Sequence, residues 1–265
     1  MLREAIVWAE SQRTLAIYYS LHGVEGERDL VMALVLFDLD NTLLAGDSER
    51  AWCEFLIDIG VLEGDCVRLE NERLYNAYLD GTLDIYESIG FQAKPLIEYS
   101  PDKLRRWQEE FMASRVEPMI TAAAVALVEK HRAAGDELAI VTASSSFVSW
   151  PISQRFRIPT LLATELERVG NRYTGRVSGT PTFREGKVIR LLEWLQETGH
   201  TLEGSYFYSD SHNDLPLLQW VDNPVAVDPD SVLRVFAETV NWPILYVHSA
   251  DDPVAVAPDP LLARR

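Results

Sequence analysis

The sequence has few cysteines, few basic residues and no long apolar run, and each shortage excludes a class of protein. Only two cysteines occur among 265 residues. Neither lies in a CxxC pair or near a histidine ligand pattern, so the chain has no disulfide framework or zinc site. We interpret Cys53 and Cys66 as ordinary packing residues. No stretch approaches the ~18 apolar residues that a membrane-spanning helix needs.

Basic residues are also outnumbered by acidic ones. Lys and Arg total 24 against 41 Asp and Glu, which leaves a formal net charge of −17. Such a charge repels the phosphate backbones of nucleic acids and anionic lipid surfaces, so neither nucleic acid nor membrane is expected as a partner. A small anion can still bind where a local cation and a metal concentrate positive charge.

The two ends of the chain differ from its middle. Residues 1–31 lack a continuous apolar stretch of signal-peptide length, which predicts a cytoplasmic location. Met32 stands directly before the first predicted strand. We therefore interpret residues 1–31 as a dispensable extension, or as the product of a start site assigned too far upstream. Residues 248–265 are rich in Pro and Asp and are expected to form a loose tail.

The middle of the chain alternates between strand and helix patterns. The run ALVLF at 33–37 is typical of a parallel strand buried on both faces, and the alternation continues after Pro118. Residues 47–117 are helix formers without a convincing strand, and a hairpin is expected around residues 169–171. These patterns predict an α/β fold, a doubly wound, Rossmann-like parallel sheet formed by residues 32–46 and 118–247, with a helical insert at 47–117.

Polar and acidic side chains follow the predicted strands. Functional groups of such sheets gather at the carboxyl ends of the strands, where we expect these side chains to converge. Asp38, Asp40 and Asp210 would bring three carboxylates together, and their negative charge calls for a hard cation. Oxygen ligands suit Mg²⁺. The candidate residues, given in chain order with the one basic residue among them, are Asp38, Asp40, Thr42, Thr142, Lys187, Asp210, Asn213 and Asp214.

Four short motifs carry a resemblance to a known family. "DLDNT", the strand-end Thr142, the isolated Lys187 and "SDSHNDLP" together resemble the motifs of the haloacid dehalogenase (HAD) superfamily across residues 33–247. The helical insert resembles the cap of the phosphoserine-phosphatase-like branch, subfamily IB, and residues 47–117 are called the cap below. The stretches "LFDLDNTLLAGDS", "HRAAGD", "YTG", "FYSDSHNDLPLL" and "PVAVDPD" are similar to proteobacterial HAD-type histidinol-phosphatases.

The resemblance implies a phosphatase that acts on a small phosphorylated metabolite; no oligomeric state is assigned. Asp38 would be the nucleophile that forms an aspartyl-phosphate, and Asp40 would protonate the leaving group and then activate water. Mg²⁺ would be held by the carboxylates of Asp38 and Asp210 and by the backbone carbonyl of Asp40. An aspartate at position 40 favours hydrolysis over a long-lived phosphoenzyme.

The same resemblance implies how the phosphoryl group is held. Thr142, the amide of Ala143 and Asn213 would bind its oxygens, and Lys187 would offset their charge. Thr42 would support the phosphate site, and Asp214 would act on the metal through water or through contacts with its ligands. Ser209 and Ser211 stand where phosphoserine phosphatases commonly have glycines.

Substrate choice is expected to lie in the cap. Asp47 occupies the position, nine residues after Asp38, that faces the substrate's amino group in the related branch. An amine-bearing ester is therefore favoured: histidinol phosphate first, phosphoserine second. Histidinol phosphate has no carboxylate and needs no arginine. The aromatic and acidic cap residues Trp52, Glu72, Tyr75 and Tyr78 are expected mainly to pack, and the alternative is that they bind a flat cationic ring of the substrate. The cap also contains four basic residues, Arg68, Arg73, Arg105 and Arg106.

Other functions remain open at this point. A generalist phosphatase, a phosphotransferase or mutase, and a phosphate-binding regulatory protein would all use this scaffold, although a pure binding protein has no need of an acid/base at Asp40. The serines of "ASSSF", residues 143–147, lack a GxSxG elbow. They are expected to cap the following helix and to contact the phosphate through the backbone.

Overall fold

The computed structural model describes residues 32–248, so the predictions for residues 1–31 and 249–265 lie outside it. A six-stranded sheet organises this part of the chain, and all of its strand pairs are parallel. The predicted parallel sheet is thereby confirmed. In spatial order the strands are β3 (Thr160–Thr164), β2 (Glu137–Ser145), β1 (Leu34–Phe37), β6 (Tyr206–Ser209), β7 (Asn223–Val227) and β8 (Ile244–Leu245).

Helices cover both faces of this sheet, because the central strands are apolar on both sides. In β1, Val35 and Phe37 face the core that includes α8 and α9, whereas Leu34 and Leu36 face the core that includes α10, α11 and α12. This alternation follows the two-residue period of a strand. The five helices are α8 (Ala122–Ala133), α9 (Ser146–Arg155), α10 (Glu185–Thr198), α11 (Leu215–Leu218) and α12 (Ser231–Val240).

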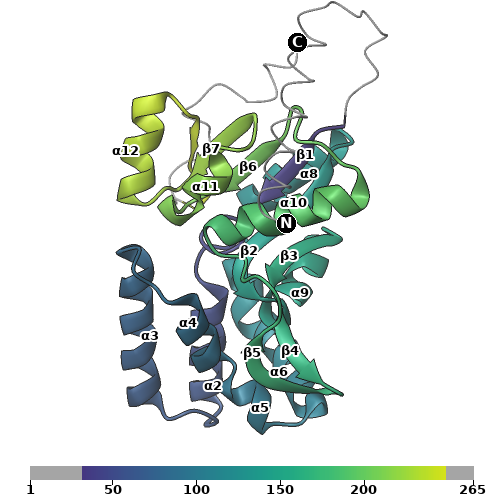
Figure 1. The fold of residues 1–265 in the computed structure, drawn as a ribbon. Helices are drawn as coiled ribbons and strands as arrows, with labels where there is room; N and C mark the ends of the chain where they lie inside the picture. The colour runs from purple at the N-terminus through teal and green to yellow at the C-terminus, as the bar shows by residue number, and fades with distance from the viewer. Residues whose placement is uncertain (1–31, 249–265) are drawn as a thin grey trace, which may run out of the picture.

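The cap is helical, and Figure 1 shows its helices α2, α3 and α4 below the sheet. The chain enters it directly after β1 and returns to the sheet through α8. Its elements are α2 (Ser48–Asp58), α3 (Gly64–Leu79), α4 (Ile85–Gln92), α5 (Lys94–Glu98), α6 (Pro101–Phe111), a π-helical turn (Met112–Val116) and α7 (Glu117–Met119).

A hairpin of β4 (Leu166–Val169) and β5 (Arg172–Val177) forms a separate antiparallel sheet. Its turn contains Gly170 with a φ of 62°, as the predicted hairpin requires. Strand β5 contacts α4 and α5, and Figure 1 shows the hairpin beside the cap helices. The hairpin therefore extends from the core to the cap, a position that its sequence did not reveal.

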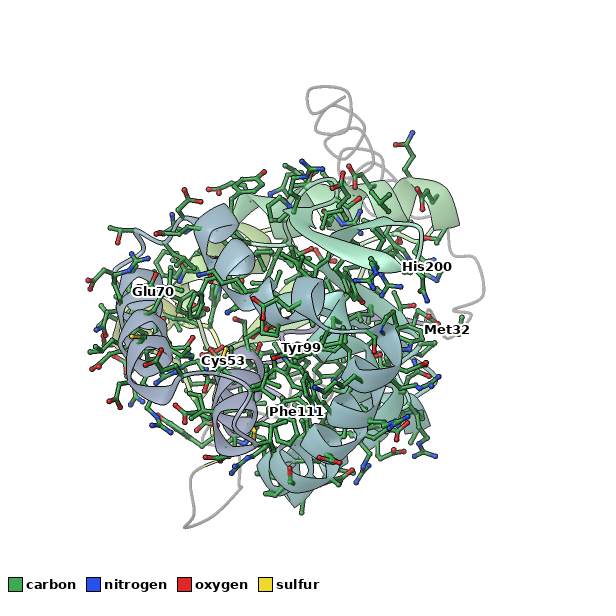
Figure 2. The ribbon with its side chains drawn as sticks, turned by 90° about the horizontal axis from the view of Figure 1, so that it is seen from below. Met32, Cys53, Glu70, Tyr99, Phe111 and His200 are labelled. Atoms are coloured by element: carbon green, nitrogen blue, oxygen red, sulfur yellow. The ribbon has the colours of Figure 1, made fainter. Side chains whose placement is uncertain are left out.

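The cap has an apolar interior that continues into one core of the sheet. Phe111 is fully buried, and Figure 2 shows it among the crowded inner side chains, with Met32 at the edge. Cys53 is also buried, and burial raises the pKa of its thiol to about 12. Cys66 is exposed, so its interpretation as a packing residue is wrong.

Within residues 32–248 no single helix is long and apolar enough to cross a membrane. The helical stretches Pro101–Met119 and Ala122–Ala133, bent by 91°, meet the length and composition criteria only as a pair.

Candidate active site

A tight turn after β1 presents Asp38 and Asp40 at the carboxyl end of the sheet. The amide of Asp38 donates to the carbonyl of Tyr208 in β6 at 2.8 Å, which continues the strand pairing by one residue. The amides of Leu43 and Leu44 then both donate to the carbonyl of Leu39, at 2.9 and 3.0 Å. This turn fixes the backbone of both aspartates before the chain enters the cap.

Asp38 is held by a buried lysine. Lys187 Nζ lies 2.7 Å from Oδ1 of Asp38 and 2.7 Å from Oδ2 of Asp214, and its side chain is 3% exposed. Burial raises the pKa of Asp38 to about 7 against the lowering effect of Lys187. Burial also opposes the charge on Lys187, but Asp214 and Asp38 raise its pKa above the ordinary value. Ser209 Oγ donates to Asp214 at 2.7 Å and completes the group.

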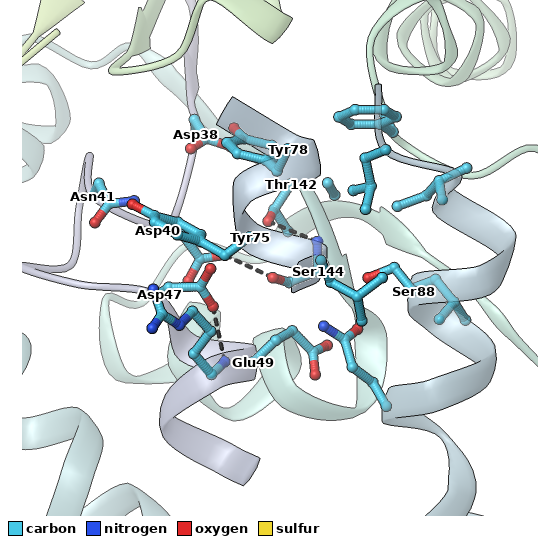
Figure 3. Close-up of a pocket in the computed structure, with 18 of the residues that line it drawn as sticks. Asp38, Asp40, Asn41, Asp47, Glu49, Tyr75, Tyr78, Ser88, Thr142 and Ser144 are labelled. Atoms are coloured by element: carbon cyan, nitrogen blue, oxygen red, sulfur yellow. Dashed lines mark hydrogen bonds between the residues drawn. The ribbon is translucent and has the colours of Figure 1, made fainter. Parts of the chain in front are cut away.

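Asp40 accepts a hydrogen bond at each carboxylate oxygen. The amide of Ser48 donates to Oδ1 at 2.6 Å, and the hydroxyl of Ser144 donates to Oδ2 at 2.6 Å. Figure 3 shows Ser144 directed at Asp40 in the pocket. A hydroxyl can donate to an ionised carboxylate and accept from a protonated one. The arrangement therefore accommodates both protonation states that acid/base chemistry at Asp40 needs.

Asp210 lies close to Asp38 and is bound to the turn after β1. Thr42 Oγ1 accepts from the amide of Asp210 at 3.0 Å and lies 3.2 Å from Oδ1 of the same residue. Burial and the charges of Asp38 and Asp214 raise the pKa of Asp210 well above its ordinary value. Neighbouring buried carboxylates with this excess of negative charge fit a hard cation.

No group of three or more His, Cys, Asp or Glu side chains placed to hold a metal ion occurs among residues 32–248. The side-chain donors that Asp38 and Asp210 offer are two carboxylates. Mg²⁺ is commonly bound through one or two carboxylates while it keeps several waters, so this donor set fits it.

Seven of the ten predicted site residues line one pocket. Thr142 and Ala143 lie on its wall, and Thr142 Oγ1 accepts from the amide of Ser144 at 3.2 Å. The others that line it are Asp38, Asp40, Asp47, Lys187 and Asp214, whereas Thr42, Asp210 and Asn213 do not.

Asn213 connects the core to the cap. Its Nδ2 donates to the carbonyl of Tyr78 at 2.9 Å, and its Oδ1 accepts from Nε of Arg184 at 2.9 Å. Arg184 also donates to the carbonyl of Gly81 at 2.5 Å, and Tyr78 OH donates to Ser211 Oγ at 2.7 Å. The side chain predicted to bind the phosphoryl group is thus engaged with the end of α3.

The cap wall of the pocket is acidic and aromatic. Asp47 caps α2 through the amide of Arg50 at 2.9 Å, and burial raises the pKa of Asp47 to about 7. Burial raises the pKa of Glu49 to about 7 as well. Tyr75 and Tyr78 also line the pocket, where their rings can contact a ligand as well as pack.

The arginine that lines the pocket is one that the sequence analysis missed. Arg50 lies with its guanidinium 4.3 Å from the ring centroid of Tyr75. None of the four cap arginines named above lines the pocket, and Trp52 is buried in the core. Glu49 and Arg50 stand in the first turn of α2, shortly after Asp47. Their closeness to Asp47, which was predicted to bind the substrate, was the sequence signal that could have identified them.

The three serines after Ala143 have separate partners. Ser144 binds Asp40, Ser145 donates to Glu49 through its amide at 2.8 Å and its hydroxyl at 2.7 Å, and Ser146 donates to Glu165. No side-chain capping bond is present at the start of α9, so the predicted capping role is wrong. Asp40 after β1, Glu49 in the cap and Glu165 before β4 accept these hydroxyls instead.

Known proteins resemble this chain in sequence and in structure. The family model for haloacid dehalogenase-like hydrolases matches residues 35–219. A protein named histidinol-phosphatase from Neisseria meningitidis is 42% identical over 216 residues, which cover 80% of this chain and 97% of that protein. A crystal structure of a Bordetella pertussis protein of unknown function is 44% identical, with a TM-score of 0.75, and the match covers 80% of this chain and 97% of that one.

A substrate-bound phosphoserine phosphatase shares the fold at a TM-score of 0.58 and 19% identity, over 77% of this chain and 90% of its own. At this identity the likeness concerns the fold alone. The residues that the family model matches include the turn after β1, the residues that line the pocket and the motif at Asp210. The chain belongs to the haloacid dehalogenase-like hydrolase family, as its four motifs indicated.

Proposed function

We propose that this enzyme is a Mg²⁺-dependent phosphomonoesterase that hydrolyses a small amine-bearing phosphate ester, with L-histidinol phosphate as the favoured substrate. One observation carries the proposal. The pocket that holds Asp38 and its partner Lys187 also holds Asp47 and Glu49 on its cap wall. A phosphate can therefore be bound at one end while a positively charged group is bound at the other.

In the proposed reaction a carboxylate oxygen of Asp38 bonds to phosphorus as the ester P–O bond breaks. Asp40 gives its proton to the leaving oxygen. It then takes a proton from the water that cleaves the aspartyl-phosphate, which releases phosphate and restores Asp38. Lys187 offsets the charge of the phosphoryl oxygens, and Thr142 and the amide of Ala143 bind them.

The carboxylates of Asp38 and Asp210, with the carbonyl of Asp40, would hold the magnesium ion. When bound, it supplies positive charge to the transferring phosphoryl group. This charge also favours the ionised form of Asp38, whose pKa is otherwise raised by burial.

The favoured substrate is supported by charge and by the named relative. At the cap end, Asp40, Asp47 and Glu49 face one arginine, Arg50, so a substrate carboxylate meets an excess of negative charge. This disfavours phosphoserine relative to an ester that has an amine and no carboxylate. The Neisseria relative is named a histidinol-phosphatase. The cytoplasmic location and the absence of nucleic-acid and membrane partners stay predictions.

The test is phosphate release from histidinol phosphate, phosphoserine, glycerol phosphate and a sugar phosphate, with Asp38→Asn as the blank. We expect kcat/KM for histidinol phosphate to exceed the others by about 100-fold, which is about 2.7 kcal/mol of transition-state preference. Chelation with EDTA should abolish turnover and added Mg²⁺ should restore it. A flat profile would mean a generalist phosphatase, and phosphoryl transfer to added alcohols above the solvent ratio would mean a phosphotransferase.

A further inference from the structure

Glu49 is a buried carboxylate that the proposed chemistry does not use. It stands in the first turn of α2, is 5% exposed, and lines the same pocket as Asp38 and Asp40. Figure 3 shows Asp47 and Glu49 on the opposite side of the pocket from Asp38. A carboxylate in such a place is costly unless a positive or hydrogen-bonding partner compensates its charge.

The protein compensates only one oxygen of Glu49. Oε1 accepts both the amide and the hydroxyl of Ser145, at 2.8 and 2.7 Å. For Oε2, residues 32–248 supply no hydrogen-bond or ion-pair partner. If anchoring Ser145 were the whole role of Glu49, a neutral glutamine oxygen would accept the same two bonds without a buried charge.

No cation of the pocket is bonded to this carboxylate. Lys187 is bound to Asp38 and Asp214 at the other end. Arg50 lies over the ring of Tyr75, and its backbone amide caps against Asp47. The charges of Asp40 and Asp47 act on Glu49 with the same sign as its own. A positively charged or N–H-donating group of a ligand would supply the missing compensation.

The cap wall also offers surfaces for a flat ring. Tyr75, Tyr78 and Phe183 line the pocket, and three uncharged polar side chains, Asn71, Ser88 and Gln92, lie on the same lining as Glu49. Aromatic faces bind flat and cationic groups, and a nearby carboxylate selects those that can donate N–H.

We infer that Glu49 is a specificity-determining residue that binds a second nitrogen group of the substrate, distinct from the amine expected at Asp47. The pocket then selects phosphate esters whose body carries two separated N–H groups, one close to the ester and one on a distal ring or chain. This inference rests on the proposed function for the location of the phosphate, and it adds the substrate class that the acidic wall selects.

The test compares three amino-alcohol phosphates that share the reacting end and the amine. Histidinol phosphate and lysinol phosphate have a distal nitrogen, whereas leucinol phosphate has none. The proteins are the wild type, Glu49→Gln and Ser145→Ala. Glutamine keeps the acceptor for Ser145 and removes the charge, while Ser145→Ala keeps the charge and removes one of the two hydrogen bonds.

We expect the wild type to prefer a substrate with a distal nitrogen over leucinol phosphate in kcat/KM. In Glu49→Gln this ratio should fall about 10- to 100-fold, since a charged hydrogen-bond partner is removed, and the change should appear mainly in KM. In Ser145→Ala the ratio should stay within about twofold, whatever happens to the absolute rates. A wild type without the preference, or a Glu49→Gln ratio within twofold of wild type, would overturn the inference.

The two proposals fail in different ways. A preference for lysinol phosphate over histidinol phosphate would reject the favoured substrate and keep the role of Glu49. If no ester is hydrolysed, the phosphatase proposal fails, and calorimetric binding of phosphate-free histidinol and leucinol to wild type and Glu49→Gln decides the inference. Tighter binding of histidinol that is lost in Glu49→Gln supports it, and equal binding of both alcohols overturns it.

Discussion

The hydroxyl of Ser144 donates a 2.6 Å hydrogen bond to Oδ2 of Asp40, while the amide of Ser48 holds Oδ1 at 2.6 Å. One partner is a backbone group in the cap and the other a side chain at the end of β2. The proposed acid/base is therefore oriented from both parts of the molecule. A side chain held in this way rarely adopts orientations in which it cannot transfer a proton.

Replacing Ser144 with alanine should slow formation of the phosphoenzyme about 10-fold for an alkyl ester, because one of the two bonds that orient Asp40 is lost. The loss should be smaller for p-nitrophenyl phosphate, whose leaving group needs little protonation. Single-turnover kinetics with both esters measures this difference. Ser146→Ala, two residues further on at the start of α9, removes a hydroxyl that binds Glu165; it is the matched control and should change neither rate. Equal losses for both esters would contradict a role in positioning Asp40.

Replacing Lys187 with methionine should destabilise the protein by about 3–5 kcal/mol, since it leaves Asp38 and Asp214 buried without their shared cation. Urea denaturation gives the free energy of unfolding. Lys94→Met removes an exposed lysine and should change that free energy by less than about 0.5 kcal/mol. A similarly small effect of Lys187→Met would show that the ion pairs of Lys187 with Asp38 and Asp214 contribute nothing to stability.

Replacing Gly186 with alanine should lower activity by displacing the start of α10. A Cβ at this position would lie 2.0 Å from the backbone carbonyl of Pro181, so the helix that carries Lys187 must shift. We expect kcat to fall at least 10-fold, on the scale at which small misplacements cost rate. Gly90→Ala in α4 meets no atom within 4 Å and serves as the control. Steady-state kinetics that match wild type for Gly186→Ala would contradict this account of Lys187.

The stability of the protein should depend on Glu49 in a pH-sensitive way. The pKa of Glu49 is about 7 in the folded state, above its ordinary value of 4.5, so the folded state binds more protons between these values. The stabilising contribution is complete below pH 4.5 and is lost as the pH rises through 7. Relative to wild type, Glu49→Gln should therefore gain about 2–3 kcal/mol of unfolding free energy between pH 5 and pH 8.

Urea denaturation at both pH values measures this gain. Glu72→Gln, at an exposed position of α3, is the control and should change the unfolding free energy by less than about 0.5 kcal/mol at either pH. A constant difference between Glu49→Gln and wild type would contradict the raised pKa. If Glu49→Gln gains stability at pH 8 and loses the substrate preference, the charge of Glu49 serves function at the expense of stability.

Much of the fold could be predicted from sequence because its signals are local. The apolar run of β1 and the helix between Thr121 and Gly135 depend on residues adjacent in the chain, and both elements are present. The turn at Gly170 was equally visible. The packing of the hairpin against α4 and α5 could not be predicted, because no sequence pattern in the hairpin indicates which helices it contacts.

The candidate site divides in the same way. Asp38, Asp40 and Lys187 could be found because each stands at a strand end or a helix start in a short motif. The roles of Glu49, Ser144 and Arg184 depend on partners up to 104 residues away in the chain. Asn213 was recognised by its motif. The two hydrogen bonds of its side-chain amide, to Tyr78 and Arg184, depend on how α3 packs and could not be predicted.

These contacts of Asn213 affect how substrate enters the pocket and how product leaves it. The end of α3 is tied to the loop that follows Asp210 through Tyr78, and to the start of α10 through Gly81 and Arg184. The cap helix α3, the loop that follows Asp210 and the helix α10 that carries Lys187 thus share one junction. Any opening wide enough to break it disturbs the surroundings of Asp210 and Lys187 at the same moment, so access to the pocket and readiness for chemistry are governed by a single set of bonds.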